Sequence, residues 1–199
     1  MTDDAKRKFL RSEILLATLN ASLATRNEKA KVYAAGVGED EKTEVRAGIS
    51  KRLTELDAAY LGGGVTGESH CENIESFAGD LGKEFRQYFE GQRFRIGITQ
   101  KLVNLYLKYI WVLEWIPEPP HCPFDGVVIS HISGLPAESR NWTTLDNLDA
   151  YRKLVDLALK TARDQKYSSL AIWELENYEK WRTKRLEESV SAELGVDEI

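Results

Sequence analysis

The sequence predicts an all-α fold, an irregular bundle of seven or eight helices, and three observations support this prediction. Apolar residues recur at spacings of three and four along most of the chain, which is the period of one face of an α-helix. No segment shows a convincing period-two alternation of the kind that marks a half-buried strand. Glycines and prolines cluster between most of the periodic segments and therefore mark the connections.

The N-terminal part of the chain predicts two helices. Residues 5–35 carry a long amphipathic pattern, and residues 41–61 place a second apolar stripe on one helical face. The glycine-rich stretch at residues 62–67 then offers flexible, exposed backbone. We therefore expect an N-terminal helical hairpin, residues 1–61, that is separable from a main helical domain, residues 69–190.

The main domain begins with a third helix. Ser69 and Glu72 have the spacing of a capping box, in which each side chain satisfies a free backbone N–H group of the helix start. This helix is expected to end at Gly79 or Gly82, and a further helix is expected over residues 83–91.

Residues 99–116 predict the centre of the fold, because this helix is apolar almost all the way round. Leu105 is accordingly expected in the core. A run of prolines ends the helix, since proline cannot continue one. A short helix follows, although the β-branched residues of 125–132 leave a strand as the alternative. The remaining segments are two helices, residues 145–165 and 168–188, and a frayed tail, residues 191–199.

The composition predicts a soluble globular protein with a substantial core. Of the 199 residues, 42% are apolar and 30% are charged, and the five tryptophans and eight tyrosines argue against disorder. The sequence carries no signal-peptide pattern and no apolar run long enough to span a bilayer. We therefore expect a cytoplasmic protein that does not bind membranes.

The charge is unevenly distributed. A net charge of -5 argues against an obvious nucleic-acid-binding protein. However, residues 83–108 hold six basic and two acidic side chains, whereas residues 109–149 hold one basic and six acidic side chains. The basic stretch predicts phosphate contacts by Arg86, Arg93 and Arg95, and the alternative is a solvated helix face followed by a loop.

The dipeptide His-Cys occurs twice, at His70-Cys71 and at His121-Cys122. Two histidines and two cysteines can hold a zinc ion tetrahedrally. Adjacent side chains diverge on a helix, however, so we expect no metal and no cofactor, and interpret the cysteines as buried apolar thiols. Nothing in the sequence marks either cysteine as an activated nucleophile.

A lysine and an aspartate stand out within residues 96–132. Lys101 follows the glycine turn at Gly97 and opens an apolar helix, and Asp125 stands in a Pro-x-Asp turn before the next apolar segment. This order resembles the core of the helix-hairpin-helix DNA glycosylases, in particular the 8-oxoguanine branch. The resemblance implies that Lys101 and Asp125 are catalytic and face each other. It also implies that Gly97 belongs to a DNA-contacting hairpin, and that the partner is duplex DNA with a damaged base.

The chemistry that this resemblance implies begins at the sugar. A lysine amine attacks the C1′ carbon, and a nearby carboxylate stabilises the positive charge that develops there. The damaged base is flipped out of the duplex and stacked on aromatic side chains. The candidates for stacking are Tyr106, Tyr109, Trp111 and Trp115.

Both residues also have simpler interpretations. Lys101 can be a surface lysine whose stem packs on the apolar face of its helix. Asp125 can be the N-cap of the following helix, a role that is compatible with facing an active site. The alternative function is a non-catalytic helical interaction module of a bacterium or mobile element, which binds a protein partner through its tryptophans and its last helix.

Overall fold

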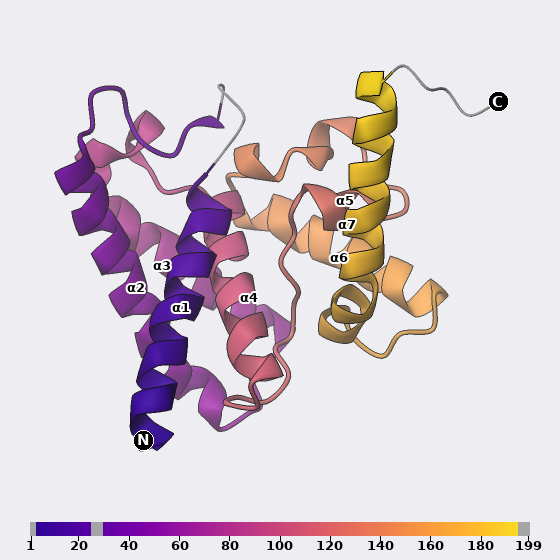
Figure 1. The fold of residues 1–199 in the computed structure, drawn as a ribbon, viewed down its shortest axis with the longest axis horizontal. Coiled ribbons are helices and arrows are strands. Elements are labelled where there is room, and N and C mark those ends of the chain that lie inside the picture. The colour runs from indigo at the N-terminus through magenta and orange to yellow at the C-terminus, as the bar shows by residue number, and fades with distance from the viewer. Residues whose placement is uncertain (1–2, 25–29, 195–199) are drawn as a thin grey trace.

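The computed structural model describes residues 3–24 and 30–194, the side chains of residue 138 and of residues 188–194 excepted. Within this part the chain is all-α, as the sequence predicts (Figure 1). The only β-type pairing there is one antiparallel bridge between Tyr33 and Phe89. The helices are α1 (Asp3–Leu23), α2 (Glu39–Leu61), α3 (Gly67–Glu84), α4 (Ile96–Val112), α5 (Gly126–Ser130), α6 (Leu148–Asp164) and α7 (Leu170–Leu194).

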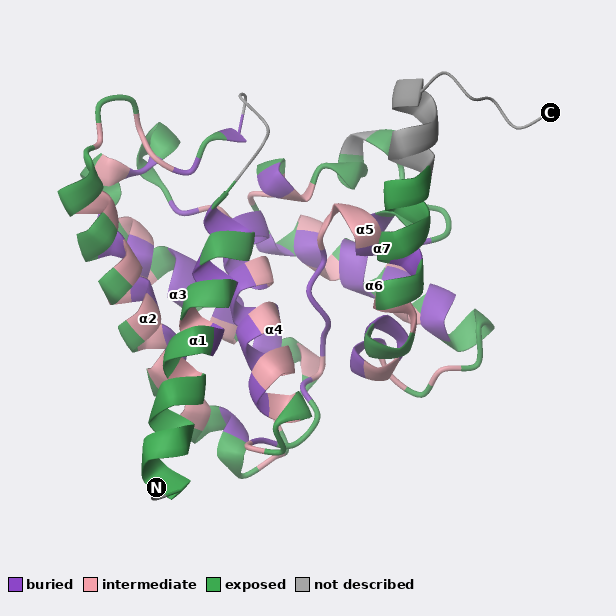
Figure 2. Ribbon diagram, in the orientation of Figure 1, coloured by how far each residue is buried: buried purple, intermediate pink, exposed green. Residues whose placement is uncertain are grey.

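The helices form two groups that lie side by side. Helices α1 to α4 make up one group and α5 to α7 the other (Figure 1). Helix α1 packs on α4, α5 packs on α7, and α6 contacts α3 and α4. The buried side chains form one continuous core that reaches from Ile14 in α1 to Trp181 in α7, as the purple ribbon segments in Figure 2 illustrate.

Helix α4 lies at the centre but is not buried on every side. It begins at Ile96, three residues before the predicted start, and ends at Val112. Leu105 is only partly buried and lines a cleft, so the prediction that it lies in the core was wrong. The apolar residues surround the helix because one stripe faces the core and another faces this cleft. The core stripe includes Leu102, Val103, Tyr106, Leu107 and Ile110.

The first helix is shorter than predicted. Helix α1 ends at Leu23, and residues 31–34 are not helical. This segment pairs with the connection between α3 and α4, where Ala34 N donates to Tyr88 O over 3.0 Å. Val32 and Tyr33 belong to the residue types that favour such pairing, and the helical periodicity concealed this. Residues 25–29 lie outside the described residues.

Helix α3 also differs from the prediction. Its N-cap is Thr66, whose hydroxyl accepts a hydrogen bond from Ser69 N while the Ser69 hydroxyl accepts one from Thr66 N. The capping box therefore lies three residues earlier than expected. The helix continues through both glycines that were expected to end it, because its packed apolar face offsets a cost of about 1 kcal/mol for each. The helix predicted over residues 83–91 is instead two short 3-10 turns.

The short helix after the prolines is confirmed as α5, so the strand alternative was wrong. Helix α7 continues through Leu194, into the predicted tail, whose last five residues lie outside the described part. No described helix is long and apolar enough to cross a membrane.

The proposed division at the glycine loop stays a prediction. Arg11 of α1 forms an ion pair with Asp57 of α2 and donates to the Tyr106 hydroxyl of α4 over 2.8 Å. Residues 1–61 are thus bonded both within the predicted hairpin and to the rest of the chain.

Candidate functional site

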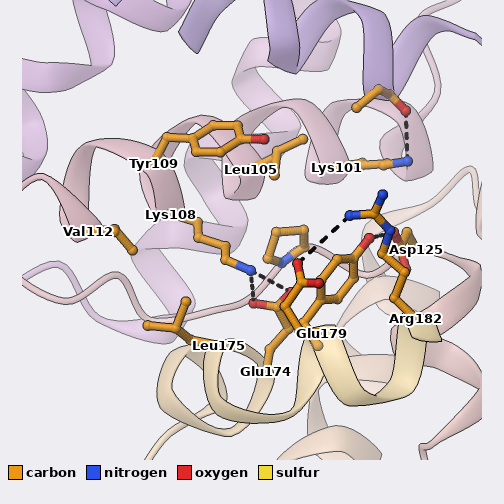
Figure 3. Close-up of a pocket in the computed structure, with 13 residues that line it drawn as sticks. Lys101, Leu105, Lys108, Tyr109, Val112, Asp125, Glu174, Leu175, Glu179 and Arg182 are labelled. Atoms are coloured by element: carbon orange, nitrogen blue, oxygen red, sulfur yellow. Dashed lines mark hydrogen bonds and ion pairs between the residues drawn. The ribbon is translucent and has the colours of Figure 1, made fainter. Parts of the chain in front are cut away.

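A cleft lies between α4 and α7, and the Lys101 and Asp125 side chains both line it. Its narrow half has a volume of about 400 Å³ and runs between these two helices (Figure 3). Its wide half has a volume of about 730 Å³ and is bounded by α1, α5, α7 and the turn at Trp142. Four residues line both halves: Ala21, Lys101, Asp125 and Arg182. Lys101 and Asp125 therefore lie where the two halves meet.

Lys101 is held at this junction by α1 and by an aromatic ring. Its Nζ donates to the backbone oxygen of Ala21 over 2.7 Å and lies 4.6 Å from the centroid of a Trp142 ring. The last turn of α1 carries no basic residue of its own, so Lys101 supplies a donor and a positive charge to its free carbonyl groups. Burial lowers the pKa of Lys101, and the charge of Asp125 opposes this effect.

Asp125 is the N-cap of α5, as one interpretation of the sequence predicts. Its Oδ1 accepts hydrogen bonds from the backbone of Val127 over 2.8 Å and of Val128 over 3.1 Å. Its Oδ2 accepts a hydrogen bond from the Tyr178 hydroxyl of α7 over 3.2 Å. Burial and then the charge of Asp125 raise the pKa of Tyr178. The carboxylate thus joins the start of α5 to the wall of the cleft.

A buried side chain links the two backbone segments that carry the candidate residues. The Gln100 amide donates from Nε2 to Phe124 O over 2.7 Å, and its Oε1 accepts from Phe124 N over 3.1 Å. Gln100 directly precedes Lys101, and Phe124 directly precedes Asp125. This pair of hydrogen bonds sets the separation of the two backbones without using either candidate side chain.

The narrow half combines an apolar wall with an ion pair. Lys108 Nζ donates to Oε1 of the buried Glu174 over 2.8 Å and lies 4.8 Å from the centroid of the Tyr178 ring. Burial raises the pKa of Glu174, and Lys108 lowers it. Sequence reasoning missed Glu174 and Tyr178, although their spacing of four residues places them on one face of the last helix. Apolar contacts in this half come from Leu105, Tyr109, Val112 and Leu175.

Two of the four aromatic residues suggested for base stacking, Tyr106 and Trp115, make other contacts. Tyr106 is fully buried and donates to Asp57 over 2.8 Å. Trp115 packs against Arg11, whose guanidinium carbon lies 5.4 Å from the ring centroid. Tyr109 lines the narrow half of the cleft and Trp142 lines the wide half, so these two rings are available there.

The predicted phosphate-contacting arginines do not line this cleft. Arg86 and Arg93 line a separate hollow beside α3, and Arg93 forms an ion pair with Asp146. Arg95 donates over 2.7 Å to the backbone oxygens of both Ala30 and Lys31. Arg95 thereby holds the segment after α1 in place.

Gly97 lies inside the first turn of α4, and not in a hairpin loop. A Cβ atom at this position would lie 1.8 Å from Trp142 O, and Gly97 N donates to Leu145 O over 2.8 Å. The absence of a side chain therefore lets the 142–145 segment pack directly on α4. That packing in turn places the Trp142 ring against Lys101.

The two His-Cys dipeptides meet in the core through their histidines. The rings of His70 and His121 are in edge contact, with their centroids 4.6 Å apart. His70 contacts Asn104 Oδ1 at 2.7 Å, His121 contacts the Tyr151 hydroxyl at 2.9 Å, and Asn104 donates to that hydroxyl over 3.1 Å. Burial lowers the pKa of His70 to about 4 and also lowers the pKa of His121. The sequence repeats the dipeptide but does not reveal this network.

The cysteines beside these histidines have the character of core residues. Burial raises the pKa of Cys71 to about 11 and also raises that of Cys122 well above its usual value. Both thiols are therefore protonated at neutral pH, which makes them poor nucleophiles and poor metal ligands. Among the residues that the structure describes, no group of three or more His, Cys, Asp or Glu side chains is placed to hold a metal ion.

Comparison with known proteins identifies no similar protein. No family model matches the chain, and searches of curated proteins and of solved structures give no significant match.

Proposed function

We propose that this protein processes damaged DNA, with Lys101 as an amine nucleophile and Asp125 as the neighbouring carboxylate. The observation that supports this proposal is that both side chains line one cleft at the junction of its two halves. The pairing of Gln100 with Phe124 supports it further, because catalytic groups need a fixed separation.

The proposed reaction takes place at the C1′ aldehyde of an abasic site. The neutral Lys101 amine adds to this carbon, and the resulting carbinolamine loses water to give an imine. Asp125 accepts a proton from the attacking nitrogen and returns one to the departing hydroxyl, so that no net proton is consumed before the imine is protonated. The two steps release one water molecule and require no oxidant or reductant.

The surroundings of Lys101 favour an amine that can react. Burial lowers its pKa, which increases the neutral fraction at a given pH. In that state one N–H group can still donate to Ala21 O, while the lone pair of the nitrogen is free to face the cleft. Asp125 retains acceptor capacity on Oδ2, because that oxygen receives one hydrogen bond from Tyr178.

The narrow half of the cleft is suited to an extruded base. Its volume of about 400 Å³ exceeds that of a single nucleobase, and its walls offer the Tyr109 ring and apolar side chains. The Lys108–Glu174 ion pair supplies polar atoms in the same half. A base held there would place its sugar near Lys101.

Borohydride trapping tests the proposal. Borohydride reduces the imine to a stable secondary amine, so wild-type protein should become covalently attached to a duplex with an abasic site. Lys101→Arg keeps the charge and a donor to Ala21 O but cannot form this imine, and should abolish the adduct. The matched control is Lys160→Arg on the exposed face of α6, which should trap as well as wild type.

A second variant tests the carboxylate. Asp125→Asn keeps an acceptor for the α5 backbone but removes the charge, and should slow trapping by about 10²-fold or more if Asp125 transfers the proton. The proposal fails if wild-type protein forms no adduct, or if Lys101→Arg traps as efficiently as wild type.

A second candidate function is a non-catalytic module that binds a protein partner. The observation that favours it lies on α1, where Phe9 is 63% and Leu16 51% exposed on one helical face. The tryptophans that this alternative was expected to use are all buried or half-buried. Sedimentation of wild type and of Phe9→Ser/Leu16→Ser tests the simplest partner, a second copy of the chain. Self-association that the double substitution removes would favour this function.

A further inference from the structure

We infer that the wide half of the cleft is a phosphate-binding subsite, formed by Arg182 and Arg185 of α7. The two arginines line one hollow of about 730 Å³. The inference deepens the proposed function, because it rests on that function for the carrier of the phosphate, a DNA strand. The binding of a phosphate group can nevertheless be measured without any reaction.

The charge of the wide half is the first argument. Arg182 and Arg185 line this half together with Asp125, which is the only acidic side chain among the lining residues. Both oxygens of that carboxylate already accept hydrogen bonds, Oδ1 from the start of α5 and Oδ2 from Tyr178. An anion that enters the wide half therefore meets an excess of positive charge on a chain that is acidic overall.

The availability of the two arginines is the second argument. The only ion-pair partner of Arg182 in the described part is Glu179, at 3.8 Å, and both side chains are exposed, so this pair contributes little. Figure 3 shows Arg182 reaching from α7 towards Lys101 and Asp125. Arg185 makes no ion pair or hydrogen bond with any residue that the structure describes. Among the residues whose side chains are described, neither guanidinium group has a strong partner to lose when a ligand binds.

The backbone of α5 makes room for the second arginine. A Cβ atom on Gly126 would lie 3.1 Å from Nη1 of Arg185, so the guanidinium group rests against a position that carries no side chain. Arg182 and Arg185 are three residues apart and thus share one face of α7. Two guanidinium groups at this spacing can donate to different oxygens of one phosphate or to neighbouring phosphates.

The position of the subsite relative to Lys101 indicates that the phosphate belongs to a nucleotide unit. Lys101 lines both halves, with the apolar narrow half on one side and the arginines on the other. A ligand that spans the cleft would present a flat group to Tyr109, a phosphate to the arginines, and the atoms between them to Lys101. A nucleotide unit of a DNA strand has this order of base, sugar and phosphate.

The experiment measures binding to a duplex that carries a tetrahydrofuran abasic-site analogue, which has no aldehyde and cannot form the imine. Fluorescence anisotropy compares wild type with Arg182→Gln/Arg185→Gln. The double substitution should weaken binding by about tenfold or more, as expected when charge-assisted hydrogen bonds are removed. It should also make binding less dependent on salt, by about 0.9 in the logarithmic slope for each phosphate that the variant no longer neutralises. The charge-matched control is Lys160→Gln/Arg163→Gln, whose residues lie on α6 and line neither half of the cleft.

A second arm identifies the phosphate group itself. The phosphates that flank the analogue are replaced by uncharged methylphosphonates. Wild type should lose affinity for this duplex, whereas the Arg182→Gln/Arg185→Gln variant should lose little more, because it already lacks the partner of the missing charge. Equal losses in wild type and variant would overturn the inference, as would a control that weakens binding as much as the arginine variant.

The outcome separates this inference from the proposed function. Binding that depends on the arginines and on the flanking phosphates, without a borohydride adduct, would retain the subsite and reject the lysine chemistry. Trapping that is undiminished in the arginine variant at low DNA concentration would retain the chemistry and reject the subsite.

Discussion

At the scale of single residues, Gln100 connects the backbone next to Lys101 with the backbone next to Asp125. It lies in the core, and its amide makes both hydrogen bonds that a neighbouring strand would make with the Phe124 backbone, 24 residues away. Gln100→Met removes both bonds, together with those to Gly97 O and from Asn104, at nearly constant volume, and it leaves the buried N–H and C=O groups of Phe124 unpaired. We expect this change to lower the free energy of unfolding by about 2–5 kcal/mol.

Urea denaturation measures this loss. The control is Gln87→Met, at an exposed position in the short turn after α3, which should change the free energy of unfolding by less than about 0.5 kcal/mol. If the two variants were equally stable, water or a rearranged loop would be supplying the bonds that Gln100 makes.

At the scale of the element, α4 separates the core from the cleft. Leu102 is fully buried, whereas Leu105, one turn later, is partly buried and lines the narrow half. Leu102→Asp places a carboxylate in an apolar interior without a partner and should leave the chain unfolded at room temperature. Leu105→Asp should retain a cooperative thermal transition with a melting temperature a few degrees lower. Thermal unfolding followed by circular dichroism distinguishes the two variants. An equal loss of stability in both would mean that the cleft wall is as tightly packed as the core.

The loop between α2 and α3 provides a second test at this scale. Gly63 and Gly64 have φ angles of +69° and +79°, and the loop around them makes few hydrogen bonds. Limited proteolysis should cut first within residues 62–66. If residues 1–61 form a separable hairpin, the two fragments will then elute apart in size-exclusion chromatography. Co-elution would mean that the contact of Arg11 with Tyr106 and the packing of α1 on α4 hold the halves together.

At the scale of the whole molecule, the buried histidines tie stability to pH. The pKa of His70 is about 4 when folded and 6.5 in the unfolded chain, and that of His121 is lowered in the same direction. The contribution is therefore fully present above pH 6.5 and declines as pH falls towards 4, because the unfolded state binds protons that the folded state excludes. Proton exclusion by His70 should reduce the free energy of unfolding by about 1–2 kcal/mol between pH 6.5 and 5, and His121 should act in the same direction.

The groups facing this pair are neutral at those pH values. Burial raises the pKa of Tyr60 to about 12 and raises that of Tyr151, and Asn104 does not titrate. Chemical denaturation across this pH range measures how the free energy of unfolding changes with pH, and His121→Asn should make that dependence weaker. A slope that this substitution leaves unchanged would assign the pH dependence to carboxylates elsewhere.

The sequence was sufficient for the helical class, for the central place of α4 and for the cap at Asp125, because these follow from local periodicity and local hydrogen bonding. It was insufficient where a segment distant in the sequence determines the local structure or the burial of a residue. Tyr33 leaves the helical pattern because the Phe89 segment pairs with it, and Leu105 faces a cleft whose other wall is α7. No local sequence pattern reveals that the Phe89 segment pairs with Tyr33 or that α7 lies opposite Leu105.

The candidate site shows the same limit. Lys101 and Asp125 could be selected from the sequence, because each stands out against apolar neighbours. The residues that complete the cleft could not, because Glu174, Tyr178 and the two arginines look like one face of an ordinary surface helix. Arg93 and Arg95 looked available for phosphate, but one pairs with Asp146 and the other holds the backbone after α1.

The late position of α7 in the chain has a consequence for protein synthesis. The ribosome synthesises Lys101 and Asp125 before it synthesises α7, which forms the opposite wall of their cleft. Until that helix docks through Trp173 and Trp181, the amine and the carboxylate stand on an open surface. A nascent chain that stalls before Leu170 would thus expose the Lys101 amine and the Asp125 carboxylate without the wall of the cleft that α7 supplies.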